Sequence, residues 1–365
     1  MLKKFFINNI IKSFILIFLI LFIAVNKISK RFLDQYNFET RTMPNYLEKV
    51  YGKENIEDYQ TVISEQSGML DYKPFVEFAE KKKLGKFTSV SDFGNRCNRN
   101  SISKCELPKG GKKEIWMFGG STTFGYGVKN DETIAASIER HLNGDYRVIN
   151  FGAGYYFSTQ ERILFNNLLL EFPAPHSVIF LDGVNDFYRS YAYNQTFYSN
   201  NIKYKMSKTS GDDLRDYFKE RYYRLNIVRL INEFKFKKQK ININKSLDDK
   251  KISELVNVLI NNQKINQSTG QNYNIKILNI LQPAPIFDDS YSTSKVIQEF
   301  KQNDKIAKVK LGYELYLTQK DDSVLNLSEL MIKEPMYVDT FHYTPKFNDV
   351  MANIAIMKLE LKNAN

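Results

Sequence analysis

Residues 114–125 read Glu-Ile-Trp-Met-Phe-Gly-Gly-Ser-Thr-Thr-Phe-Gly, an apolar run followed by a glycine-rich turn that holds a serine. The run Ile115–Phe118 is short and ends at glycines, which is typical of a buried strand. In a parallel α/β sheet, ligands bind in the loops that follow the strands. The turn therefore places Ser121 where a reactive group is expected, and a serine nucleophile there needs a base from elsewhere in the chain.

A regular alternation of strands and helices follows this turn. We expect further strands at 147–151, 177–181 and 274–281, and helices at 132–142, 158–170, about 295–317 and about 348–361. Strands that alternate with helices of this length predict a mostly parallel sheet covered on both faces. The predicted fold class is therefore α/β, a three-layer α/β/α sandwich of the flavodoxin-like kind.

A helical insertion interrupts the alternation between about residues 188 and 272. Leu214–Lys240 has the spacing of a long basic amphipathic helix, Leu247–Ile260 continues with helical spacing, and Asn261–Asn272 is polar and predicts a loop. Two interpretations stay open: a solvated pair of surface helices, or a cap that faces substrate or membrane. The predicted organisation is an N-terminal helix over 1–31, an irregular lead-in over 32–113, and a main domain over 114–365.

The N-terminal stretch Phe5–Val25 is mostly apolar. As a helix it is roughly 30 Å long, which spans a bilayer, whereas its uninterrupted part, Phe14–Val25, suits a signal-peptide core. Ala24-Val25-Asn26 is a poor cleavage site, so we favour an uncleaved signal anchor over a cleaved signal peptide. The lysines and arginine on the two sides balance, so charge does not fix the orientation.

Two cysteines, Cys97 and Cys105, lie eight positions apart in a polar segment. A zinc site would need two more ligands, and no His or Cys lies nearby to supply them. A disulfide and a pair of free thiols both remain open. A disulfide would place the domain in an oxidising compartment, and this pair favours a domain on the outer, extracytoplasmic side of the membrane.

The formal net charge is +11 and the sequence pI is about 9.2. The lysines are spread along the chain, with one dense run at 235–240, and form no recognisable nucleic-acid module. We therefore expect no nucleic-acid partner. Attraction to an anionic surface, such as phospholipid headgroups or an acidic glycan, is at least as natural.

Only three histidines occur in the chain: His141, His176 and His342. Asp339 stands three residues before His342, so this histidine is a candidate general base with a carboxylate to orient it. His141 and His176 show no such partner in the sequence, and we predict that both are non-catalytic. On these residues the chain has the features of a hydrolase or acyl transferase with a serine nucleophile.

Four polar turns converge on one edge of the predicted sheet. Ser121 follows the first strand, Gly152–Tyr155 the second and Gly183–Asp186 the third, while Asp339 and His342 come just before the last helix. Because the carboxyl ends of parallel strands meet at one edge, these turns can share a site.

On these residues the chain resembles the SGNH hydrolases, also called the GDSL family, over roughly Glu114–Leu361. The family is named after a Ser, a Gly, an Asn and a His in four separate blocks, matched here by Ser121, the Gly152–Tyr155 turn, Asn185 and His342. Each block alone is weak evidence, but all four occur in the right order. The helical insertion is unmatched.

The resemblance implies a role for each residue. Ser121 would be the nucleophile, His342 the base oriented by Asp339, and Asn185 an oxyanion-hole donor together with the backbone N–H of Ser121. No metal and no cofactor are implied. Gly120 stands where the family name has an aspartate, which is tolerable because that aspartate is not the nucleophile.

The second block departs from the family pattern at its oxyanion-hole glycine. Counting five residues on from Asn150 reaches Tyr155, which can still supply a backbone N–H if its φ is negative. The neighbouring residues of the turns would support the site: Gly152, Gly154, Gly183 and Asp186. Asp186 is expected to cap and rigidify its loop rather than to react.

The expected chemistry is acyl transfer through a covalent serine ester. Water as acceptor gives an esterase, and a sugar hydroxyl gives an O-acyltransferase. Anchored members of the family often act on cell-envelope or exported polysaccharides, so the resemblance points to O-acyl groups of a glycan, with lipid esters less favoured. A catalytically silent binding or scaffold module of a surface-polysaccharide assembly is the third alternative.

Overall fold

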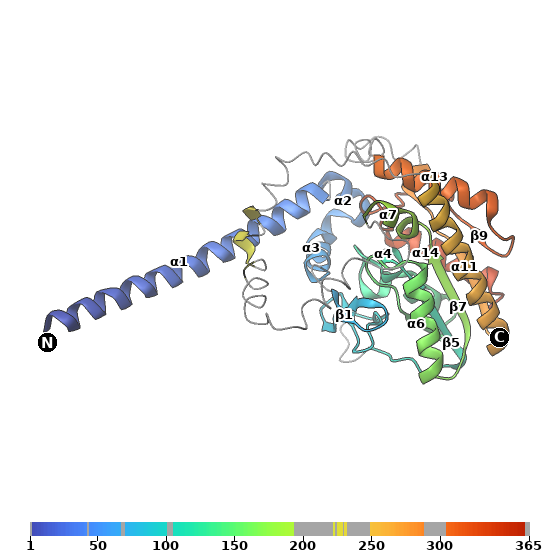
Figure 1. The fold of residues 1–365 in the computed structure, drawn as a ribbon, viewed down its shortest axis with the longest axis horizontal. Helices are drawn as coiled ribbons and strands as arrows, with labels where there is room; N and C mark the ends of the chain where they lie inside the picture. The colour runs from blue at the N-terminus through green and yellow to red at the C-terminus, as the bar shows by residue number, and fades with distance from the viewer. Residues whose placement is uncertain are drawn as a thin grey trace. The chain divides into compact units, whose positions relative to one another are not determined.

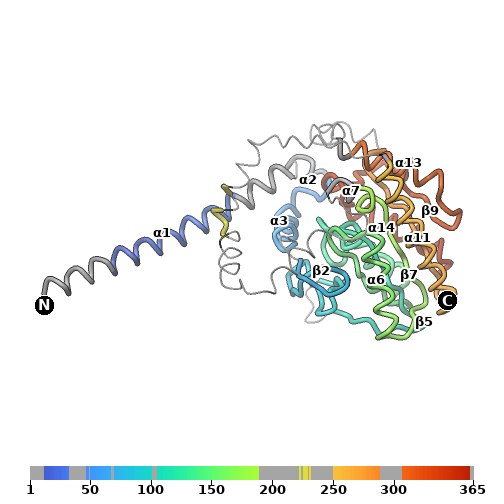
Figure 2. Tube along the Cα trace, viewed as in Figure 1, coloured from blue at the N-terminus to red at the C-terminus, as the bar shows by residue number. Residues whose placement is uncertain are grey.

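The computed structural model describes residues 2–41, 44–66, 70–100, 105–192, 222, 225–228, 230–231, 249–287 and 304–361, coloured in Figure 1 and, for the most part, in Figure 2. The chain divides into two compact units, Met1–Pro44 with Lys203–Lys245 and Asn45–Ile202 with Ser246–Asn365. Most of the predicted helix Leu214–Lys240, with its basic run, lies outside the described residues.

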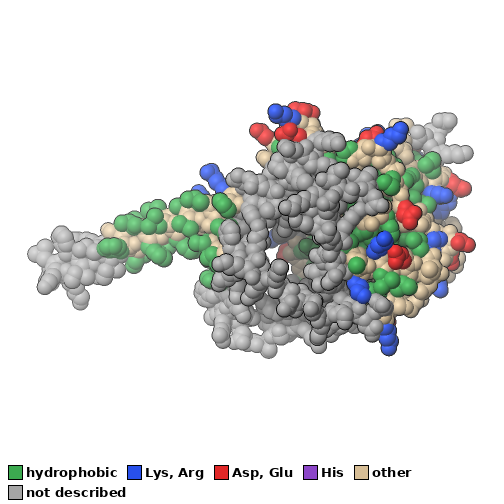
Figure 3. Space-filling view, turned by 90° about the horizontal axis from the view of Figure 1, so that it is seen from above, with side chains coloured by type: hydrophobic (Ala, Val, Ile, Leu, Met, Phe, Trp, Pro, Cys, Tyr) green, Lys and Arg blue, Asp and Glu red, His purple; other side chains and the backbone are tan. Residues whose placement is uncertain are grey.

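The first unit contains α1 (Leu2–Arg41). Within the described residues, Lys12–Phe32 is the one helical stretch long and apolar enough to cross a membrane, with a mean hydropathy of 2.0. It overlaps the predicted span Phe5–Val25, and an N-terminal signal sequence has the same properties. Its large apolar side chains are exposed, as Figure 3 shows along this helix.

The second unit is built on a parallel five-stranded sheet with the order β6-β5-β7-β8-β9. Its strands are β5 (Gly111–Gly119), β6 (Arg147–Asn150), β7 (Pro175–Asp182), β8 (Lys276–Leu281) and β9 (Leu325–Asn326). Across the three central strands, Phe118 pairs with Phe180, and Phe180 with Asn279. The four predicted strands are confirmed. The fifth, β9, was not predicted because two residues are too few to show a period.

Helices cover both faces of the sheet, because successive strand residues point to opposite sides. On one face, Met117 and Ile179 pack with residues of α5 (Ile134–His141) and α14 (Pro345–Lys358). On the other, Phe118 and Phe180 pack with Phe165 of α6 (Ser158–Glu171). Each fully buried ring of this kind contributes about 1.5–3 kcal/mol through burial. The predicted α/β/α fold class is confirmed (Figure 1).

Helix α11 (Asp249–Tyr273) corrects the predicted boundary of the insertion, since the expected loop at 261–272 is helical. Two of the polar side chains that suggested a loop are buried amides with hydrogen-bond partners. Asn262 donates to Ser158 Oγ at 2.9 Å, and Gln263 accepts from the Tyr316 hydroxyl at 2.6 Å. Polar composition was therefore misleading here.

The remaining helices of the second unit are short or pack at the edge of the sheet. They are α2 (Pro44–Tyr51), α3 (Ile56–Glu65), α4 (Ser121–Phe124), α7 (Val184–Ala192) and α13 (Asp304–Gln319), with 3₁₀ turns at Lys53–Asn55, Asn130–Glu132 and Pro285–Phe287. The first part of the predicted helix at 295–317 lies outside the described residues.

The lead-in also forms two small hairpins. They are made by β1 (Leu70–Lys73) with β2 (Glu77–Glu80), and by β3 (Lys83–Leu84) with β4 (Ser89–Val90). From Asn45 onward, the lead-in belongs to the same compact unit as the sheet.

Candidate active site

The nucleophile turn joins β5 to α4 through two glycines that have no room for a side chain. A Cβ on Gly119 would lie 2.0 Å from Thr123 Oγ1, and one on Gly120 would lie 2.3 Å from Asn185 Nδ2. Ser121 is the first residue of α4, so its backbone N–H has no acceptor within the helix. The turn therefore presents both the Ser121 hydroxyl and a backbone donor.

His342 lies against Ser121 despite a separation of 221 residues in sequence. Its Nε2 is 2.8 Å from Ser121 Oγ, and its Nδ1 is 2.7 Å from Asp339 Oδ2. With Nδ1–H donating to the carboxylate, Nε2 carries the lone pair that can accept the serine proton. The structure thus brings the three predicted residues together in the order required for nucleophile, base and orienter.

The carboxylate of Asp339 is held from its own loop. Its Oδ1 accepts the backbone N–H of Phe341 at 2.8 Å and that of His342 at 2.9 Å. Burial opposes ionisation, but His342 and these backbone donors outweigh it and lower the pKa of Asp339 below its usual value. The group is therefore a carboxylate across the neutral range.

The Asp339–His342 loop is closed at its base and leads directly into α14. Val338 N–H donates to His342 O at 2.7 Å, and Thr344 N–H donates to Met336 O at 2.9 Å. Thr344 then caps α14 by accepting the N–H of Phe347. His342 and Asp339 are therefore held by a turn with fixed ends.

Asn185 reaches the Ser121 turn from the first turn of α7, which directly follows β7. Its Nδ2 donates to Tyr156 O at 2.7 Å and lies beside Gly120. Because an amide nitrogen carries two hydrogens, one N–H remains for a ligand. Asp186 accepts from Ser158 N and Oγ at 3.1 and 2.6 Å, which ties the start of α7 to the start of α6.

The turn after β6 does not meet the condition set for Tyr155, because its φ is +65° rather than negative; the residue nevertheless keeps its backbone N–H. Tyr156 N–H donates to Ala153 O at 3.2 Å, and a turn of this kind needs a left-handed third residue, usually glycine. Tyr155 is 70% exposed, so its side chain is largely in solvent. A non-glycine residue held there costs about 1–3 kcal/mol.

The turn leaves Tyr155 as its free backbone donor. The N–H of Gly152 donates to Asn150 Oδ1 at 2.9 Å, and that of Gly154 donates to Glu80 Oε1 at 2.7 Å. Among the described residues, no protein acceptor takes the N–H of Tyr155.

Two glycines of the turns after β6 and β7 have no room for a side chain. A Cβ on Gly152 would lie 2.3 Å from Phe124 N. Gly183 likewise has no room, because its Cβ would lie 2.5 Å from the Tyr313 hydroxyl.

The lead-in supplies residues of the site that sequence reasoning missed, first of all Arg96. Its buried guanidinium donates to Phe124 O at 2.8 Å, to Val128 O at 2.6 Å, to Gly125 O and to Asn130 Oδ1. Burial lowers the pKa of Arg96 to about 10, so it remains protonated at neutral pH. Arg96 therefore fixes the backbone that leaves the nucleophile helix, and no local sequence pattern marks it for this role.

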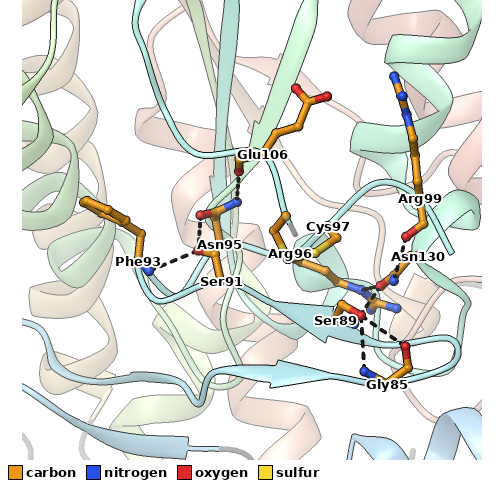
Figure 4. Close-up of a disulfide and its surroundings, with 11 residues drawn as sticks. Gly85, Ser89, Ser91, Phe93, Asn95, Arg96, Cys97, Arg99, Glu106 and Asn130 are labelled. Carbon is orange, nitrogen blue, oxygen red and sulfur yellow. Dashed lines mark hydrogen bonds between the residues drawn. A yellow bond between two sulfur atoms is a disulfide. The ribbon is translucent and has the colours of Figure 1, made fainter. Parts of the chain in front are cut away.

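Cys97, the residue after Arg96, forms a disulfide with Cys105 (Figure 4). The segment around it is also held by hydrogen bonds, since Arg96 N–H donates to Asn150 O and Asn95 Nδ2 donates to Glu106 O, each at 2.9 Å. The covalent link therefore lies beside the strand end that carries Asn150 and beside the buried guanidinium.

Neither of the other histidines contacts Ser121. His141 has a carboxylate partner in the fold that the sequence did not show, because its Nε2 lies 2.9 Å from Asp349 Oδ1. The pair joins α5 to α14, and proximity in the fold supplies what the sequence spacing did not show. His176 Nδ1 lies 2.6 Å from Ser177 Oγ.

Three carboxyl groups at the end of β7 and in α6 and α7 are buried: Asp182, Glu161 and Asp186. Burial and mutual repulsion raise the pKa values of Glu161 and Asp182 well above the usual range. Among the described residues, no group of three or more His, Cys, Asp or Glu side chains is arranged to hold a metal ion.

Two cavities lie elsewhere in the second unit, and neither is lined by Ser121 or His342. One, of about 170 Å³, lies between α11, β8 and the turn before β9. The other, of about 120 Å³, lies beside Arg96 and Cys97.

Comparison with known proteins found no matching family model and no matching curated protein. Solved structures do match. A protein assigned to the G-D-S-L lipolytic family of Desulfitobacterium hafniense is 12% identical, with 67% of this chain and 99% of that chain covered and a TM-score of 0.36. A Bacteroides fragilis protein described as an acylhydrolase is 16% identical, covers 70% of this chain and 91% of its own, and has a TM-score of 0.34.

An acetyl xylan esterase is 14% identical, with 67% of this chain and 98% of that chain covered and a TM-score of 0.37. One of the three structures thus carries the name of the family that the sequence resembles. All three TM-scores are below 0.5, so these similarities do not by themselves assign a function.

Proposed function

We propose that this protein is a serine-nucleophile ester hydrolase in which Ser121, His342 and Asp339 form the catalytic triad. The observation that carries the proposal is the unbroken pair of hydrogen bonds, 2.8 Å from Ser121 Oγ to His342 Nε2 and 2.7 Å from His342 Nδ1 to Asp339 Oδ2. This arrangement activates a hydroxyl that is otherwise a weak nucleophile.

In the first step, Ser121 Oγ forms a bond to the ester carbonyl carbon while its proton moves to His342 Nε2. The carbonyl π electrons move to oxygen. When the tetrahedral intermediate collapses, the ester C–O bond breaks and His342 returns the proton to the departing alcohol. Water then repeats the sequence on the acyl-enzyme, which releases the carboxylic acid and restores Ser121.

We assign three donors to the oxyanion. They are the N–H of Ser121, the N–H of Tyr155 and the second amide hydrogen of Asn185, and they come from the turns after β5, β6 and β7. Donors fixed before the reaction stabilise developing charge without reorganisation, and loss of one costs about 10²–10³ in kcat.

The substrate class we propose is an O-acyl group on a cell-envelope or exported glycan, as the resemblance to anchored family members implies. The apolar stretch Lys12–Phe32 supports an anchor in a lipid bilayer. The disulfide supports an oxidising, extracytoplasmic location for the catalytic domain. The same triad transfers the acyl group to a sugar when a sugar hydroxyl replaces water.

The test is hydrolysis of p-nitrophenyl acetate by the full-length chain in detergent. Ser121→Ala and His342→Ala should each lower kcat by about 10⁴-fold or more. His141→Ala is the matched control, because His141 also pairs with a carboxylate but does not contact Ser121. Equal turnover by the native chain and Ser121→Ala would reject the triad, and an inactive native chain would favour the silent binding module.

Hydrolysis and transfer are separated by adding an oligosaccharide acceptor. Transfer requires acetylated sugar to appear by mass spectrometry while the yield of free acetate falls. A rate and an acetate yield unchanged by the sugar, with no acetylated product, support the hydrolase for that acceptor.

A further inference from the structure

Glu80, at the end of β2, is a buried carboxyl group that the proposed mechanism does not use. Only 3% of its surface is exposed. Its Oε1 accepts two hydrogen bonds, from Gly154 N–H at 2.7 Å and from the Tyr126 hydroxyl at 3.1 Å. Among the described residues, its buried Oε2 has no hydrogen-bond partner.

Such a group is unfavourable for stability. Burying a carboxylate with one oxygen unpaired costs several kcal/mol unless other interactions offset it. Arg96 supplies a favourable charge nearby, but burial still raises the pKa of Glu80. An apolar side chain at this position would stabilise the hairpin more than a buried carboxyl group does. The feature that a carboxyl group adds here is its pair of hydrogen bonds from Gly154 and Tyr126.

The first bond holds the turn that carries the Tyr155 donor. Gly154 immediately precedes Tyr155, and on the other side the Tyr156 N–H donates to Ala153 O. With the flanking amides held, the direction of the Tyr155 N–H is fixed despite its left-handed backbone.

The second bond holds a ring against the base. The Tyr126 ring lies on the His342 imidazole, with centroids 5.6 Å apart and an interplanar angle of 33°. Because Gly154 N–H and the Tyr126 hydroxyl donate to the same Glu80 oxygen, this carboxylate links the turn to the ring beside the histidine.

We propose that Glu80 is a positioning residue that sets the oxyanion turn at Gly154–Tyr155 and, through Tyr126, the plane of the His342 ring. The proposal rests on the proposed hydrolase function. It assigns to the β1–β2 hairpin, which lies outside the family-like segment, the task of completing the active site. Glu80 itself touches no reacting atom.

The test compares kcat and KM for p-nitrophenyl acetate across variants of the full-length chain. Glu80→Leu removes both hydrogen bonds and should lower kcat about 100-fold, since a small displacement of a catalytic group costs about that much. KM should stay near the native value, because an oxyanion hole acts on the transition state. Glu80→Gln keeps Oε1 as acceptor and should retain most of the native kcat.

Asp71→Leu is the control on the same hairpin, because the Asp71 carboxylate is exposed and lies 3.8 Å from Lys81 Nζ, and its kcat should be native. A folded Glu80→Leu with native kcat, or one in which only KM changes, overturns the proposal. If Glu80→Leu does not fold, Tyr126→Phe decides. It removes the hydroxyl and keeps the ring, and the proposal requires a lower kcat with unchanged KM.

Failure of this inference is distinguishable from failure of the proposed function. A Ser121→Ala variant that remains active rejects the hydrolase mechanism whatever Glu80 does. An inactive Ser121→Ala variant together with fully active Glu80 and Tyr126 variants keeps the mechanism and rejects the positioning role.

Discussion

Asp339→Asn tests the electrostatic arrangement of the base with almost no change of shape. Oδ1 of residue 339 is held by two backbone N–H groups, at 2.8 and 2.9 Å, so the amide oxygen must occupy that position. The NH₂ group then faces His342 Nδ1, where the carboxylate oxygen lay at 2.7 Å. The imidazole is forced to carry its proton on Nε2 and can no longer accept one from Ser121.

The expected loss follows from this wrong tautomer. An orienting carboxylate changed to an amide lowers kcat by about 10⁴, which at about 1.4 kcal/mol per tenfold is roughly 5.5 kcal/mol of transition-state stabilisation. The assay is steady-state hydrolysis of p-nitrophenyl acetate at pH 7.5, with the thermal unfolding midpoint measured on the same preparation.

Stability provides a second readout of the same substitution. The pKa of Asp339 is lowered in the folded state, so its ionisation stabilises the fold above the unfolded pKa of about 3.9 and this contribution is lost as pH falls. The native chain should therefore exceed Asp339→Asn in stability at pH 7, and the difference should shrink below about pH 4.

Asp349→Asn is the control, because it removes the carboxylate partner of His141 and should leave kcat unchanged. The reasoning is refuted if Asp339→Asn has the same unfolding midpoint as the native chain and a kcat less than tenfold lower. Equal losses for Asp339→Asn and Asp349→Asn would show a nonspecific effect instead.

Four further outcomes are expected. Arg96→Met leaves buried carbonyls without their donor and should lower the urea-measured free energy of unfolding by at least about 3 kcal/mol, and an unchanged value contradicts the clamp. Replacing Cys97 and Cys105 by Ser opens a loop of sequence separation 8 and should cost about 2–3 kcal/mol in urea unfolding, a difference that must vanish under reducing conditions. Burial raises the folded pKa of Asp182, so its stabilising protonation is lost as pH rises; Asp182→Asn should exceed the native chain in urea-measured free energy of unfolding at pH 8, by a margin that shrinks toward acid pH. Tyr155→Gly should relieve the left-handed strain and gain about 1 kcal/mol while kcat is retained, whereas a large kcat loss would give the exposed ring a role in binding.

The sequence predicted the sheet and the positions of Ser121, Asn185, Asp339 and His342 because each signal is local. A short apolar run ending in glycines marks a buried strand, and a carboxylate three residues before a histidine can be read without knowing the fold. The order of these signals along the chain was enough to place them at one edge of the sheet.

The supporting residues were not predictable because their contacts are non-local and their types are ordinary. Glu80 reaches Gly154 across 74 residues, and Arg96 reaches Val128 across 32. Both come from the lead-in, where no period is visible. The positive φ of Tyr155 was missed for a related reason, since a turn closed by Ala153 and Tyr156 imposes it on a residue whose type gives no sign of it.

The central claim, that Ser121 is a nucleophile activated by His342, is tested most directly by mapping a covalent adduct. The full-length chain in detergent is treated with a fluorophosphonate and analysed by intact mass and peptide mass spectrometry. The account predicts one adduct, located on Ser121, formed slowly or not at all in His342→Ala and at the native rate in His141→Ala. The account is contradicted if Ser121 stays unmodified in a native chain that is shown to be folded. It is also contradicted if Ser121 is labelled at the same rate in the native chain and in His342→Ala.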